Sequence, residues 1–341
     1  MAHPPASGPV DQFKVLTKYE RIDGTLKLWP LKVSLIQGAN DGVFPSGSTW
    51  DSDQSEWDVI WKKFFAEKWD PLATLPGNAT TFSDVTAVRN KVYYYVISSI
   101  KGDDVLFTPN QQYGYFPDTG PGPSKLLRGN WNEGYFGTCT QAELFGAAEL
   151  CTALAFTPSA QNTNTSWVWH KFILDGKILF MPDLSIASTA WYDLYINGLV
   201  YGVDGPGETP DGFGIGSRNQ KKQVTKNNRT YRVRLPKGSA APTTEYLTDL
   251  TATDGRWSEG EWNRTMGRMG CANFTRCTRS RLGNKPVYTT DNTNLTAAYT
   301  QHLRQSNAAV LFWYSGGSDV PTYTSWTTAY FAWRPVLELI L

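Results

Sequence analysis

The chain has 341 residues and a formal net charge of +1, and 14% of its residues are aromatic whereas only 18% are charged. This near-neutral charge provides no positive field for gathering nucleic acid, and no apolar run reaches the roughly 20 residues that cross a membrane. We therefore expect no nucleic-acid partner and no membrane insertion. Residues 1–11 contain no apolar secretory signal, so we also expect assembly in a cytoplasm.

The N-terminal part is predicted to contain two strands and one helix. Residues 26–37 and 91–100 are rich in alternating β-branched and aromatic residues, as strands are. Between them, residues 55–69 place Trp57, Trp61 and Phe64 at helical spacing. We expect this aromatic face to pack on the local sheet; docking into a neighbouring subunit is the alternative.

A Pro/Gly-rich stretch at residues 116–125, FPDTGPGPSK, marks the predicted domain boundary. Neither a central strand nor a helix crosses such a stretch, because proline lacks an N–H donor and glycine is conformationally free. The length of the chain also favours two domains. We therefore predict one domain at residues 1–125 and a second at residues 126–341.

The second domain is predicted to mix short helices with hairpins. Asp175-Gly176 is typical of a tight hairpin turn, because both residues tolerate a positive φ. The pattern predicts hairpins at residues 167–181 and 222–235, and helices at residues 140–154, 188–199 and 261–269. The closing residues 330–341, YFAWRPVLELIL, are too apolar to be a frayed end. We expect them to pair inside a sheet, with Pro335 restricting the strand to an edge or an irregular step.

Five segments of this domain carry a resemblance. They read WVWHKFILDGK from Trp167, WYDLYINGLVYG from Trp191, TYRVRLPKG from Thr230, EWNRTMGRM from Glu261 and the closing WRPVLEL from Trp333. In this order they resemble the C-terminal module of tailed-bacteriophage virion proteins, found in tail fibres, baseplates and head fibres. The closing segment also resembles the C-type-lectin-like fold.

The resemblance implies an α+β, β-rich fold. It comprises a C-terminal C-type-lectin-like mixed α/β module with long ordered loops, at residues 126–341, and an N-terminal particle-attachment domain, at residues 1–125. It also implies location in a virion, other virion proteins as partners, and many copies. We therefore expect a homo-oligomer, although no heptad repeat specifies a trimer.

No constellation of residues favours catalysis. The chain lacks a Gly-X-Ser-X-Gly elbow and a His-Glu-X-X-His motif, and it has only three histidines. Asp193, Glu259 and Glu261 are eligible as paired glycosidase carboxylates, so a carbohydrate-active enzyme remains an alternative. Formylglycine-generating enzymes, which share the lectin-like fold, need a late cysteine pair, and no cysteine follows Cys277. We predict that the chain is not an enzyme and carries no cofactor.

Metal binding is not expected either. The cysteine spacings, Cys139 with Cys151 and Cys271 with Cys277, match neither a zinc site nor a redox pair. Buried thiols and disulfides both remain open for these cysteines. The carboxylates of the 202–216 loop lack the spacing of a calcium-binding EF-hand, so a plain surface loop is favoured. The basic run at residues 219–234 contains no aromatic platform for nucleic acid and is interpreted as a solvated hairpin.

Residues 300–328 are the candidate ligand-binding region. They combine small polar residues with Trp313, Tyr314, Tyr323 and Trp326. Rigid aromatics among adaptable polar residues are typical of binding surfaces, and aromatic faces stack on sugar rings. In the resembled modules, the ligand-facing loops lie just before the closing strand. The alternative is that Trp313 and Trp326 are core residues.

The sequence thus predicts a virion structural protein, most simply a tail-fibre, tail-tip or baseplate component that attaches to a host polysaccharide or protein. A head decoration or capsid fibre protein is the first alternative. A carbohydrate-active enzyme or a secreted lectin is the alternative from another class.

Overall fold

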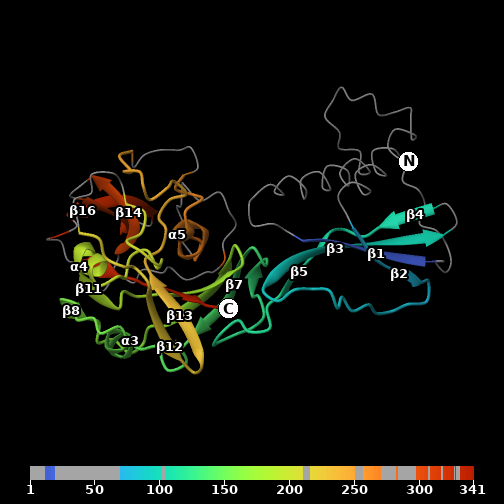
Figure 1. Ribbon diagram of the computed structural model, residues 1–341, viewed down its shortest axis with the longest axis horizontal. Coiled ribbons are helices and arrows are strands. Elements are labelled where there is room, and N and C mark those ends of the chain that lie inside the picture. The colour runs from blue at the N-terminus through green and yellow to red at the C-terminus, as the bar shows by residue number, and fades with distance from the viewer. Residues whose placement is uncertain are drawn as a thin grey trace. The chain divides into compact units, whose positions relative to one another are not determined.

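The protein is β-rich, with several antiparallel sheets and few short helices (Figure 1). The structure is a computed structural model that describes residues 12–19, 70–101, 104–209, 216–249, 256–269, 282, 297–305, 308–315, 318–325, 327 and 331–341. The chain divides into two compact units, Met1–Pro117 and Asp118–Leu341. This division lies within the Pro/Gly-rich stretch, a few residues before the predicted boundary at residue 126.

One antiparallel sheet makes up the described part of the N-terminal unit. Its strands run in the order β2-β1-β3-β4, and β5 also pairs with β3. Their bounds are β1 Gln12–Tyr19, β2 Asp70–Pro76, β3 Lys91–Lys101, β4 Asp104–Phe107 and β5 Gln111–Tyr115. The prediction of a strand at residues 91–100 is confirmed by β3. The strand predicted at 26–37 and the helix predicted at 55–69 lie outside the described residues.

A seven-stranded antiparallel sheet forms the centre of the C-terminal unit, in the order β12-β13-β18-β10-β9-β7-β6. The strands are β6 Arg128–Gly129, β7 Glu133–Cys139, β9 Trp169–Leu174, β10 Lys177–Pro182, β12 Lys222–Lys226, β13 Arg229–Arg234 and β18 Val336–Leu339. Both predicted hairpins are present. Their turns lie at Asp175-Gly176 and Asn227-Asn228, and all four turn residues have positive φ.

The closing segment moves from one sheet to another at Pro335. Before it, β17 Phe331–Trp333 belongs to a small sheet of order β17-β11-β8, with β11 at Ala187–Thr189 and β8 at Ala160–Gln161. After it, β18 lies between β13 and β10 in the interior of the large sheet. Proline cannot donate a ladder hydrogen bond, so it is accommodated where the chain leaves one sheet for the next. The irregular step, and not the sheet edge, is therefore the correct alternative.

The described helices are short, and each begins later or ends earlier than predicted. They are α3 Ala147–Ala153, α4 Trp191–Ile196, α5 Glu261–Arg264 and the 3-10 turn η1 Met266–Arg268. Thr140, at the predicted start of the first helix, makes the bond of an N-cap, since its hydroxyl accepts from the Glu143 N–H. Gly146 is extended, however, so the helix begins only after it. At the C-terminal end of α4, the positive φ of Gly198 stops that helix before the predicted residue 199.

The core of the C-terminal unit packs α5 and its flanking residues against the large sheet. Trp257, Trp262 and Met266 belong to the same buried cluster as Phe172 and Leu179 of the sheet. Trp262 and Met266 thus face the interior, since each is 1% exposed. None of the helices in the described part of the chain is long and apolar enough to span a membrane.

Candidate functional site

The candidate ligand-binding residues lie on strands. Three strands that come before β17 in the chain form a fourth sheet, β14-β15-β16, with bounds Ala297–Gln305, Ala308–Ser315 and Ser318–Ser325. Trp313 and Tyr314 are on β15 and Tyr323 is on β16, whereas Trp326 lies outside the described residues. The expectation of a loop surface is therefore wrong for most of this region. The sequence AAVLFWYS is rich in β-branched and aromatic residues, which explains why it pairs as a strand.

The hairpin brings these backbone positions onto adjacent strands. Trp313 pairs with Val320 and Tyr314 with Asp319, near the turn, while Tyr323 pairs with Val310 further along. Positions 310 and 313 are three residues apart along β15, which is about 10 Å. Successive positions of a strand alternate between the two faces of a sheet, so this register does not bring all three positions to one face. The choice of these residues as ligand contacts stays a prediction.

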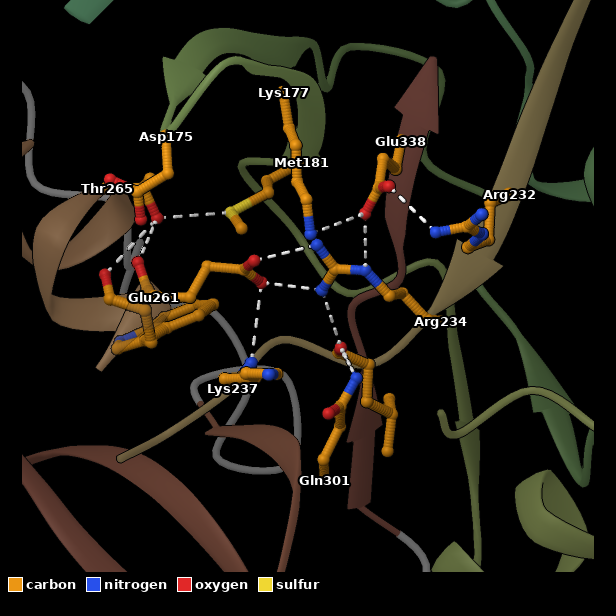
Figure 2. Close-up of polar contacts among 12 residues, drawn as sticks. Asp175, Lys177, Met181, Arg232, Arg234, Lys237, Glu261, Thr265, Gln301 and Glu338 are labelled. Carbon is orange, nitrogen blue, oxygen red and sulfur yellow. Dashed lines mark hydrogen bonds and ion pairs between the residues drawn. The ribbon is translucent and has the colours of Figure 1, made fainter. Parts of the chain in front are cut away.

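A buried network of charged side chains is the most distinctive chemical feature of the C-terminal unit (Figure 2). Figure 2 shows the Arg234 guanidinium between two carboxylates. Arg234 Nη2 donates to Glu261 Oε2 at 2.7 Å, and its Nε donates to Glu338 Oε2 at 3.0 Å. The side chains of Arg234, Glu261 and Glu338 are 5%, 9% and 9% exposed. This burial makes the network costly to disrupt, because each charge depends on its partners.

Two further cations flank Glu338. Arg232 Nη1 lies 2.9 Å from its Oε1, and Lys177 Nζ lies 3.9 Å from its Oε2. Burial raises the pKa of Glu338, but Arg234, Lys177 and Arg232 outweigh it and hold that pKa below its ordinary value. Burial likewise opposes the charge on Arg234, and Glu261 and Glu338 overcome it and raise the pKa of Arg234. Glu338 and Arg234 are therefore both charged at neutral pH.

A second network joins α5 and η1 to the edge of β9 and β7. Arg264 donates to both carboxylate oxygens of Asp175, each at 2.6 Å, and its Nη2 lies 2.7 Å from Glu133 Oε1. Arg268 Nη1 donates to the other oxygen of Glu133 at 3.1 Å. Bidentate Arg–carboxylate pairs fix orientation as well as distance. The helical segment is thus held on the sheet by charge at both networks.

The five resembling segments meet at these networks. Glu338 comes from the closing segment, Arg234 from the segment at Thr230, Glu261 and Arg264 from the segment at Glu261, and Asp175 from the segment at Trp167. The fifth segment, from Trp191, contributes Gly202. A Cβ added there would lie 2.9 Å from Arg232 Cδ and 3.0 Å from Arg234 Cβ. The segments that carry the resemblance therefore hold one another in place.

The basic run at residues 219–234 is neutralised within the molecule. Five of its cations pair with carboxylates from distant segments, which agrees with a polar hairpin. The pairs are Lys221–Asp204, Lys226–Glu149, Arg229–Asp118, Arg232–Glu338 and Arg234–Glu338. Asp204, a carboxylate of the 202–216 loop, thus pairs with the Lys221 amine. No group of three or more His, Cys, Asp or Glu suited to a metal ion occurs among the described residues.

The described cysteines are buried free thiols. Burial raises the pKa of the Cys139 thiol to about 12 and also raises that of Cys151. Cys271 and Cys277 lie outside the described residues. His170, the histidine in the apolar Trp167 segment, lies in the core with its Nδ1 3.0 Å from the Tyr135 hydroxyl.

Comparison of the chain with protein-family models, with curated proteins and with solved structures finds no match.

The sequence predicted the segments that build the charge networks but not the networks themselves. The one available signal was a charge repeated in apolar strands, as in Arg232, Arg234 and Glu338.

Proposed function

We propose that this chain is a structural protein of a tailed-bacteriophage virion, located in a tail fibre, tail tip or baseplate and used for attachment to the host surface. One observation carries the proposal: the five segments that resemble phage virion modules converge on the buried charges around Arg234. Segments that resemble a known module are stronger support for that module when they also contact one another in the folded chain. The same convergence supports the finer assignment of a C-type-lectin-like C-terminal module.

In this proposal the two units have different roles. The N-terminal unit attaches the protein to the particle, and the C-terminal unit presents the β14–β16 region to a polysaccharide or protein of the host surface. Each contact need only be weak, because many copies on one particle raise the effective concentration. Aromatic residues on this hairpin suit stacking on sugar rings.

Binding to host cells tests the proposal. The full chain is presented multivalently to host cells, to cells stripped of surface polysaccharide and to cells treated with protease, and the bound fraction is measured. We expect strong binding that one of the two treatments abolishes. The W313A/Y314A double variant should also lose it. The matched control is Y113S/Y115S, which removes two exposed tyrosines, 56% and 43% exposed, from β5 of the N-terminal unit and should bind normally.

Three other results would overturn the proposal. Absence of binding to all cells, with antibody labelling of particle heads in electron micrographs, favours the head decoration or capsid fibre alternative. Shortening of purified polysaccharide by the chain favours a carbohydrate-active enzyme. Absence of the chain from purified particles, measured by mass spectrometry, removes the virion assignment altogether.

A further inference from the structure

A lysine ammonium group is buried against the first residues of the C-terminal unit. Lys171, on β9, is 0% exposed. Its Nζ donates to Thr119 Oγ1 at 2.9 Å, to the Gly120 carbonyl at 3.3 Å and to the Pro123 carbonyl at 2.7 Å. An ammonium has three N–H donors, and here a single short segment supplies an acceptor for each. A neutral amine has only two donors, so it would keep both carbonyls only if the Thr119 hydroxyl reversed its role and donated to the amine lone pair, and the charge-assisted bonds would be lost.

The surroundings of this ammonium are otherwise unfavourable to charge. Its Nζ lies 5.0 Å from the centre of the Phe136 ring and 5.8 Å from that of Phe180. No carboxylate among the described residues forms an ion pair with it. The titratable groups that act on it are the Cys139 thiol of β7, Asp118, Arg229 of β13 and Glu143. Burial lowers the pKa of Lys171 to about 8. Keeping a charge at this position therefore costs stability.

The segment that Lys171 binds lies closely on the sheet. Asp118, the first residue of the C-terminal unit, pairs with Arg229 at 2.8 Å. Gly120 and Gly122 have φ of +79° and +73°, and an added Cβ would lie 2.9 Å from Phe180 Cζ or 2.8 Å from Cys139 Cβ. The backbone of this segment thus lies directly against β10 at Gly120 and against β7 at Gly122. Its Pro/Gly content is nevertheless that of a linker.

We propose that Lys171 is a positioning residue, whose ammonium docks residues 118–123 on the seven-stranded sheet and thereby fixes the point at which the chain enters the C-terminal unit. An apolar side chain would fill the same space at lower cost, but it would give the segment no hydrogen bonds. The three donors select one arrangement of a stretch that proline and glycine leave free to adopt many. The charge therefore serves the position of the segment and not the stability of the fold.

The test separates position from stability by replacing Lys171 with Met in the full chain. The K171M variant should unfold in urea at an unchanged or higher midpoint, because the buried charge is gone. Hydrogen exchange measured by mass spectrometry should be at least about tenfold faster in residues 118–125, with exchange in β9 and β10 unchanged. Trypsin should cut faster after Lys125. The matched control is R229Q, which breaks the partly exposed pair with Asp118 and should loosen the segment far less.

A measurement on the unmodified chain provides an independent check. With exchange rates corrected for their intrinsic pH dependence, the segment should lose protection as the pH rises through about 8, where the amine loses its proton. The K171M variant should show no such change. Two results would overturn the proposal: unchanged protection of the segment in K171M, or an equal loss of protection throughout the C-terminal unit.

Discussion

Replacing Arg234 with Met tests whether the buried charges hold the C-terminal unit together. Of its partners among the described residues, Glu261 would keep only a backbone N–H, that of Lys237 at 3.4 Å, whereas Glu338 would keep Arg232 and Lys177. The cost therefore falls mainly on Glu261, whose side chain is 9% exposed and would be left without a counter-charge from the described part of the chain. Removing one partner of a buried pair typically costs about 3–5 kcal/mol. Because Glu338 remains compensated, we expect the lower part of this range.

A double-mutant cycle isolates the pair. The R234M, E261M and R234M/E261M variants are unfolded in urea, followed by the fluorescence of the buried tryptophans of the C-terminal unit. The double variant should recover at least half of the loss in R234M, since no orphaned charge remains, giving a coupling energy of about 2 kcal/mol. R232M is the matched control. Arg232 bonds the same Glu338 but is 37% exposed, so the loss should stay below about 1 kcal/mol. Additive effects, or a loss below about 1 kcal/mol in R234M, would refute the reasoning.

Three further outcomes are expected. His302 is buried, its Nε2 donates to the Ala241 carbonyl, and its Nδ1 has no partner among the described residues. Burial lowers its pKa from 6.5 to about 4, so the unfolded state binds the proton first and stability falls as the pH drops from 6.5 to 4. At about 1.4 kcal/mol per pKa unit the loss approaches about 3 kcal/mol, and urea titrations of H302Q should show a shallower pH dependence; an identical slope would contradict the assignment. The G202A variant should lose about 1–3 kcal/mol in thermal unfolding, because φ is +68° and the added Cβ meets Arg232, while G216A has neither a positive φ in this range nor an atom within 4 Å of the added Cβ and should lose less. Cys139 should react with iodoacetamide at least about a hundredfold more slowly in the native protein than in urea, as peptide mapping would show; equal rates would mean that the thiol is accessible.

Local chemistry made part of the fold predictable. The turns at Asp175-Gly176 and Asn227-Asn228 follow from residues that tolerate positive φ, and β3 follows from its alternation of apolar residues. The switch at Pro335 was one of two expected alternatives. Helix lengths were overestimated because a single residue can interrupt the pattern, as the extended backbone of Gly146 delays the start of α3.

The arrangement around Arg234 could not be predicted, because its partners are distant in the chain. Glu261 is 27 residues away and Glu338 is 104. Nothing local indicates which carboxylate meets which cation. The candidate ligand region was misread for a different reason. Its Ser, Gly, Asn and Thr suggested loops, while the AAVLFWYS run between them had the composition of the strand that it forms.

The position of β18 has a consequence for how the protein is made. This strand, the last of the sheet along the chain, pairs with β10 through Leu179 and Glu338, 159 residues apart, and also with β13. The two halves of the sheet, β12-β13 and β10-β9-β7-β6, have no hydrogen-bonded connection until it inserts. A ribosome must therefore synthesise the chain as far as Leu339 before the central sheet can close. Contacts of such long range slow folding and leave the earlier strands exposed in the meantime.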